Sequence, residues 1–154
     1  MIFVILGTQD KPFPRLLKDI EKADLNEDIL VQAGYTSFRT EKMEVRDYIP
    51  KEEFSKLIDK ADLVIAHAGV GTIMECLKKH KKLIVAPRLA KYGEHQNDHQ
   101  LDIAENFSEK GYLLPYYEGD DLSLVYEKAK TFAFTPYRSE GEGFARKLST
   151  YLGL

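Results

Sequence analysis

The stretch ADLVIAHAGVGTIMECL, residues 61–77, decides the fold class of this chain of 154 residues. Its apolar run at 63–66 is continuous rather than alternating, which is typical of a strand buried on both faces of a parallel sheet. A loop with two glycines follows at 67–71 and leads into a helix that we expect at 72–80. This order of strand, loop and helix indicates one unit of an α/β domain.

Outward from this stretch, the same unit recurs along the chain. Apolar runs predict strands at 2–6, 28–33, 43–49, 63–66, 83–86 and 112–116. Amphipathic stretches predict helices at 15–23, 51–61, 72–80, about 97–110 and 121–134. Right-handed crossovers then give a Rossmann-like, doubly wound parallel sheet of about six strands. We expect residues 1–154 to form a single domain, because no linker, low-complexity tract or repeat divides them.

Composition narrows the classes of function. A net charge of −3 and a pI near 5.8 argue against a nucleic-acid partner, which usually requires a broad basic face. The single cysteine, Cys76, cannot form an intrachain disulfide, which fits a reducing compartment. No apolar run approaches the ~20 residues that span a bilayer, and the start of the chain is too short and uncharged for a signal peptide. We therefore expect a cytoplasmic protein.

The loop at 67–71 is suited to binding a phosphate. Gly69 and Gly71 allow the backbone to approach an anion closely, and the amides and dipole of the following helix stabilise it by about 0.3 to 2 kcal/mol. Thr72 adds a hydroxyl donor, and His67 adds a ring donor. The alternatives are structural: Thr72 and Glu75 have the spacing of a capping box, the glycines can serve a turn alone, and His67 can be a satisfied structural histidine.

A first glycine loop, Gly7-Thr8-Gln9, follows the first predicted strand and should open at the same edge of the sheet. The two loops are therefore expected to face one crevice. Neither G-x-G-x-x-G nor a P-loop occurs, so the sequence favours neither a common dinucleotide site nor an ATP site. The motif D-x-D is also absent, and no metal requirement is predicted.

A third polar cluster, YGEHQNDHQ at 92–100, lies in the loop that should overhang the crevice and has the composition of a sugar-binding surface. His95 and His99 allow a zinc site, but Gln96 replaces the Glu of H-E-x-x-H and disfavours it. Another alternative is a solvated helix start that is capped by Asn97 or Asp98. The basic run KKHKK at 78–82 fits a helix C-terminus, with contact to anionic lipid as its alternative.

These clusters, in this order, resemble the C-terminal donor domain of GT-B glycosyltransferases, particularly the glycosyltransferase family 28 C-terminal group. The segments that carry the resemblance are 1–17, 30–36, 61–77 and 87–100. The wider pattern of H-x-G, a later Glu and a later Pro is met by His67, Gly69, Glu75 and Pro87. The segments look like small bacterial capsular and exopolysaccharide transferase subunits, and are similar to the catalytic subunit of the eukaryotic two-part N-acetylglucosaminyltransferase of dolichol-linked oligosaccharide synthesis.

The resemblance implies a UDP-sugar site with the following residues. The diphosphate is contacted by His67, Gly69, Gly71, Thr72, Gly7, Thr8 and Gln9. The ribose is contacted by Glu75. The donor sugar is contacted by Asn97, His99 and Gln100. Two departures, His80 and Lys82 in place of a Gly and a Pro, concern a turn. A larger departure is that the acceptor-binding half of a GT-B enzyme is missing from the chain.

The expected function is that of the donor-binding, catalytic subunit of a metal-independent, inverting UDP-glycosyltransferase. By resemblance it transfers a hexose, with galactose favoured, to a lipid-linked sugar in capsular or exopolysaccharide synthesis. A membrane-associated partner supplies the acceptor half and holds the chain at the inner membrane face, and the general base stays unassigned. The alternatives are a non-catalytic nucleotide-sugar binding or regulatory subunit and, less favoured, a sugar-nucleotide epimerase.

A helix at about 141–152 is expected beyond the last strand. Its apolar stripe is formed by Phe144, Leu148, Tyr151 and Leu152. We predict that this stripe docks on the partner subunit, with packing on the chain's own sheet as the alternative.

Overall fold

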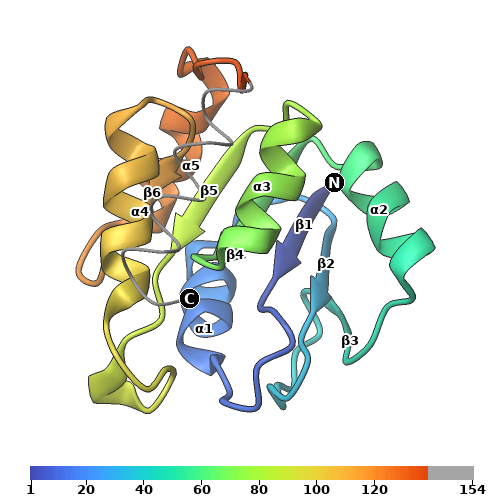
Figure 1. Cartoon of the computed structure of the whole chain (residues 1–154). Helices are drawn as coiled ribbons and strands as arrows, with labels where there is room; N and C mark the ends of the chain where they lie inside the picture. The colour runs from blue at the N-terminus through green and yellow to red at the C-terminus, as the bar shows by residue number, and fades with distance from the viewer. Residues whose placement is uncertain (139–154) are drawn as a thin grey trace.

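Six parallel strands form the centre of the chain in the computed structural model, which describes residues 1–138 (Figure 1). They lie in the order β3-β2-β1-β4-β5-β6. Their bounds are β1 Ile2–Ile5, β2 Ile29–Gln32, β3 Glu44–Arg46, β4 Leu63–His67, β5 Leu83–Ala86 and β6 Leu114–Pro115. The helices are α1 Pro14–Ala23, α2 Lys51–Lys60, α3 Val70–Lys78, α4 His99–Glu109 and α5 Leu122–Thr131, with the short 3-10 helix η1 at Ala90–Tyr92. The predicted doubly wound α/β sheet is confirmed.

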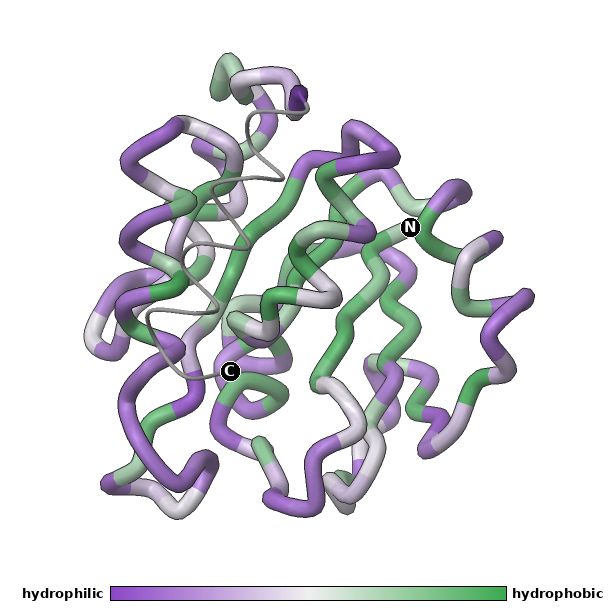
Figure 2. The backbone as a smooth tube through the Cα atoms, in the orientation of Figure 1, coloured by the Kyte–Doolittle hydropathy of each residue, from purple (hydrophilic) through white to green (hydrophobic). Residues whose placement is uncertain are grey.

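The core has two layers, one on each face of the sheet. Phe3 and Ile5 of β1 pack into the layer under α2, α3 and α4, whereas Ile2 and Val4 pack into the layer under α1 and α5. All four side chains are at most 1% exposed. Figure 2 shows the apolar residues gathered along the central strands and the hydrophilic residues on the outer turns of the helices. Continuous apolar runs therefore correspond to strands that helices cover on both sides.

The switch point of the sheet lies between β1 and β4. From β1 the chain adds β2 and β3 on one side and then returns to add β4, β5 and β6 on the other. In doubly wound sheets such a switch point leaves a crevice beyond the carboxyl ends of the two central strands. Ile5 is in register with Ala66, so the residues that follow each strand leave the sheet side by side. The two predicted glycine loops therefore meet at this crevice.

Helix α3 begins earlier than predicted. Gly69 is its N-cap and Val70 its first helical residue, which places Thr72 at the third helical position. A capping box needs its Thr at the N-cap, directly before the first helical residue. The alternative in which Thr72 and Glu75 form such a box is therefore wrong, and no side chain caps this helix.

Other boundaries also differ from the predictions. The strands at 43–49 and 112–116 are shorter, at Glu44–Arg46 and Leu114–Pro115, and α5 ends at Thr131 rather than 134. Helix α4 begins at His99. Asp98 is its N-cap but accepts a hydrogen bond from the Ala90 amide at 2.9 Å instead. The Asn97 side chain accepts from the His99 amide at 3.1 Å, so Asn97 rather than Asp98 satisfies a donor at this helix start.

The predicted docking helix at about 141–152 lies outside the described residues. Within residues 1–138, no helix is both long and apolar enough to span a bilayer.

Candidate anion-binding site at the carboxyl edge

His67 is the last residue of β4, at the switch point of the sheet, and is 5% exposed. Its ring lies against two glycines, one from each glycine loop. A Cβ built on Gly7 would lie 2.6 Å from His67 Nε2, and a Cβ built on Gly69 would lie 2.5 Å from His67 Cε1. Any side chain at either position would therefore collide with the ring. The predicted meeting of the two loops is real, and the imidazole fills the space between them.

Gln100, at the start of α4, holds the other side of the His67 ring. Its Nε2 lies 3.3 Å from His67 Nδ1, and its Oε1 accepts from the amides of Ala68 and Arg88, each at 3.0 Å. Burial, together with the nearby Arg88 guanidinium and His95, lowers the pKa of His67 to about 3. His67 is therefore a neutral imidazole at physiological pH.

The Gly7 loop is fixed by the neighbouring strand β2. The Gly7 amide donates to Gln32 Oε1 at 3.0 Å, and Gln32 Nε2 donates back to the Gly7 carbonyl at 3.1 Å. Gly34 packs on the same carbonyl, because a Cβ built there would lie 2.4 Å from it. Sequence reasoning missed Gln32, although a polar residue at the end of the apolar run 28–33 was an available signal.

Arg88 is the largest fully buried side chain in residues 1–138, with 1% exposure. Its guanidinium donates to the carbonyls of Leu6, Lys11 and Glu94, and its Cζ lies 5.1 Å from the centre of the Phe13 ring. Burial lowers the pKa of Arg88 to about 10, which leaves it charged at neutral pH. A cation thus lies behind the Gly7 loop and bonds that loop to the segment after β5. Sequence reasoning also missed this residue.

The polar cluster at 92–100 divides into supporting and accessible residues. Glu94 is 2% exposed, pairs with Arg15 at 3.0 Å and accepts from the Leu89 amide at 2.9 Å. Gln100 is likewise 2% exposed, and its side chain is hydrogen-bonded to the Ala68 and Arg88 amides and to the His67 ring. Asn97 and His99 are half-buried, so they remain available at the edge of the crevice. The cluster was predicted to be a sugar-binding surface, and these burials favour that role for Asn97 and His99 over Gln100.

The remaining predicted residues belong to the Gly7 loop and to the start of α3. Gly7 and Gln9 are half-buried and Thr8 is exposed. The first backbone bond of α3 runs from the Ile73 amide to the Gly69 carbonyl at 3.0 Å. The amides that precede it belong to the first turn, where helices leave their N–H groups unpaired. These belong to Val70, Gly71 and Thr72.

Glu75 follows on the next turn of α3 and is half-buried. This edge of the sheet thus brings the neutral His67 ring together with the N–H donors at the start of α3. Their individual contacts to a ligand stay predictions. Within the described range, no group of three His, Cys, Asp or Glu side chains is arranged to hold a metal ion.

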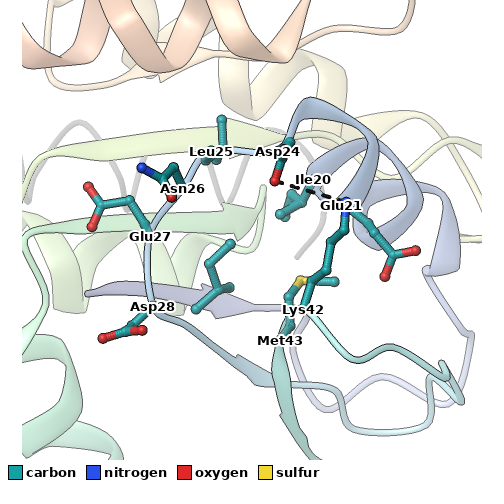
Figure 3. A pocket seen from close by; sticks show the side chains of 10 residues that line it. Ile20, Glu21, Asp24, Leu25, Asn26, Glu27, Asp28, Lys42 and Met43 are labelled. Atoms are coloured by element: carbon teal, nitrogen blue, oxygen red, sulfur yellow. Dashed lines mark ion pairs between the residues drawn. The ribbon is translucent and has the colours of Figure 1, made fainter.

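A cavity at the opposite edge of the sheet has a different character (Figure 3). Its volume is about 460 Å³, and its walls come from the end of α1 and from the segments around the starts of β2 and β3. Four carboxylates line it, with an ion pair of 3.9 Å between Lys42 and Asp24. Like charges would repel a diphosphate there. A cavity of about 340 Å³ at the carboxyl edge, lined by Pro87, Leu101 and Tyr117 among others, is better placed to extend the crevice.

Comparison with known families and proteins gives a consistent result. Residues 1–142 match the glycosyltransferase family 28 C-terminal domain. The chain is 34% identical over 124 residues to UDP-N-acetylglucosamine transferase subunit ALG13 of Homo sapiens, covering 73% of this chain and 10% of that protein. It is 32% identical over 83 residues to the subunit of the same name from Candida albicans, covering 54% of this chain and 27% of that protein. The chain thus spans well under half of either relative.

Solved structures share the fold. The solution structure of ALG13 superposes with a TM-score of 0.62 at 22% identity, over 96% of this chain and 94% of that one. Acinetobacter baumannii MurG gives a TM-score of 0.60 at 17% identity, over 84% of this chain and 41% of that one. At these identities the likeness concerns the fold alone.

Proposed function

Because the chain belongs to the glycosyltransferase family 28 C-terminal domain family, we propose that it is the donor-binding part of a metal-independent, inverting glycosyltransferase that uses a UDP-sugar. The observation that carries this proposal is the neutral His67 ring between Gly7 and Gly69, beside the first turn of α3. This arrangement offers several N–H donors to an anion at the switch point of the sheet, where such folds bind ligands.

In the proposed mechanism, the diphosphate lies against His67, the amides of Gly71 and Thr72, and the loop Gly7-Thr8-Gln9. Negative charge grows on the leaving diphosphate as the bond to the sugar breaks. Donors that are already in place stabilise that charge without reorganising, and losing one such donor typically costs about 3 to 4 kcal/mol. The bonds of Gln32 and Arg88 to the Gly7 loop support this role, because they fix the loop before a ligand arrives.

The contacts to the rest of the donor are proposed from the same positions. Glu75 would bind the ribose hydroxyls, since its carboxylate is half-buried and is not part of a capping box. Asn97 and His99 would bind the donor sugar from the edge of the crevice. No carboxylate pair of the D-x-D type is needed in this scheme, because N–H donors replace the cation.

The names of the relatives bear on the donor. Each is a subunit of a UDP-N-acetylglucosamine transferase, so UDP-N-acetylglucosamine is the first donor to test. The expected galactose donor and the capsular or exopolysaccharide pathway have no support in these comparisons. The proposed acceptor is a lipid-linked sugar. A membrane-associated partner would supply the acceptor half and the general base, and would hold the chain at the cytoplasmic membrane face.

Titration calorimetry of the purified chain with UDP tests the proposed site. Binding should be equally tight with excess EDTA and with Mg²⁺ or Mn²⁺. A strict requirement for a cation would overturn the metal-independent mechanism, and absence of UDP binding would overturn the donor site. Transfer of radiolabel from UDP-N-acetylglucosamine to membrane extracts, with and without a candidate partner, separates a catalytic subunit from a non-catalytic nucleotide-sugar binding subunit.

A further inference from the structure

We propose that Gln100 is a positioning residue that fixes His67 in the tautomer with its proton on Nε2, so that the ring donates to the diphosphate. The consequence for the ligand rests on the proposed function, whereas the effect on the ring does not. This role differs from the contact with the donor sugar that the family resemblance implies for Gln100.

The orientation of the Gln100 amide is determined by its backbone partners. The N–H groups of Ala68 and Arg88 both point at one atom of the side chain, each at 3.0 Å. A backbone N–H can only donate, so that atom must be the oxygen. The NH₂ group therefore faces His67 Nδ1, at 3.3 Å.

The His67 proton is then fixed by elimination. The Gln100 NH₂ group is a donor, so Nδ1 must accept and cannot carry the proton. Burial and the neighbouring Arg88 cation keep the ring neutral, with its pKa lowered to about 3. A neutral imidazole carries one proton, which must therefore be on Nε2. The other tautomer would place two N–H groups against each other.

The Nε2 atom lies at the edge of the ring that packs against the two glycines. A Cβ on Gly7 would lie 2.6 Å from Nε2, and one on Gly69 would lie 2.8 Å from it. Because neither residue has a Cβ, the N–H can reach a ligand at the switch point. Gln100 thus determines whether the crevice presents a donor or a lone pair to an anion.

The ring proton can be located directly by long-range ¹H–¹⁵N correlation of the labelled chain without ligand. The expected result is a single proton on Nε2, while Gln100→Glu should place a proton on Nδ1, because a carboxylate oxygen replaces the NH₂ group. The Glu side chain keeps an oxygen for the two backbone donors, so this variant should fold. A wild-type proton on Nδ1, or an unchanged ring in Gln100→Glu, would overturn the assignment.

A matched pair of variants tests what the proton does. The amide nitrogen of His67→Gln can reach the position of Nε2, whereas that of His67→Asn reaches only the position of Nδ1. We expect His67→Gln to keep most of the UDP affinity and His67→Asn to bind about 10- to 100-fold more weakly, the range for a hydrogen bond to a charged group. Equal affinities in two folded variants would refute the donor role of Nε2. If the wild-type chain does not bind UDP, the proposed function fails, and the ring measurement still decides the role of Gln100.

Discussion

Gly69 is expected to be required for ligand binding more than for folding. In Gly69→Ala the new Cβ would lie 2.5 Å from His67 Cε1, whereas ordinary contacts begin at 3.4 Å, so the ring must withdraw by about 0.9 Å, the difference between the two. A hydrogen bond of about 2.9 Å that lengthens by this amount passes beyond about 3.5 Å and is lost. The Nε2 donor would therefore no longer reach the diphosphate.

The two effects of this substitution have different sizes. UDP affinity should fall by about 10- to 100-fold, as for a lost hydrogen bond to a charged group. Forcing a methyl group against a packed ring should cost about 1 to 3 kcal/mol of stability. For a chain of this length that corresponds to a fall in melting temperature of about 2 to 12 °C. Calorimetry with UDP and thermal melting of the same preparation measure both.

Gly71→Ala is the matched control for stability. A Cβ built at that position meets nothing within 4 Å. Replacing a helical glycine by alanine should leave stability unchanged or raise it by up to about 1 kcal/mol. If Gly69→Ala folds and binds UDP as tightly as the wild type, then the position of the His67 ring does not matter for binding and the reasoning is refuted.

Three further predictions follow from the described contacts. Glu75→Ala should weaken UDP binding in calorimetry. Its free energy of unfolding should change by less than about 0.5 kcal/mol, because Glu75 does not cap α3. A loss of stability with unchanged UDP affinity would exclude the ribose contact. The free energy of unfolding should fall as the pH is lowered from 6.5 to about 3, by on the order of 1 kcal/mol per pH unit. In this pH range His67 of the unfolded chain gains a proton, whereas the buried ring of the folded chain, with its pKa at about 3, does not. Urea unfolding across that range should give a shallower slope for His67→Gln. Arg88→Met should cost at least about 3 kcal/mol, because three carbonyls lose a buried donor; a wild-type melting temperature would contradict this.

The sequence predicted the sheet and the meeting of the two glycine loops well, because both follow from the order of apolar runs and glycine turns. The apolar runs at 2–6, 63–66 and 83–86 correspond to β1, β4 and β5, which form the middle of the sheet. The lengths of the edge strands were overestimated, since β3 pairs only with β2 and ends at Arg46, two residues before the 76% exposed Tyr48. The start of α3 was misplaced because the glycines were assigned to the loop, although Gly71 is helical.

The supporting residues could not be predicted, because their partners are distant along the chain. Gln32 bonds to Gly7 across 25 positions, and Arg88 bonds to Leu6 across 82. The family resemblance implied a donor-sugar contact for Gln100, whereas its hydrogen bond to His67, 33 positions away, is visible only in the folded chain. Composition identifies a polar residue as unusual in an apolar context, but only the folded chain shows which group satisfies it.

The double hydrogen bond between Gln32 and the Gly7 backbone also bears on the entropy of binding. Both the amide and the carbonyl of Gly7 are held from β2, and Gly7 packs on the His67 ring near Nε2. One wall of the proposed phosphate site is therefore ordered before an anion binds, so little conformational freedom should be lost on binding. We expect Gln32→Ala to weaken UDP binding mainly through a less favourable entropy, which calorimetry separates from the enthalpy.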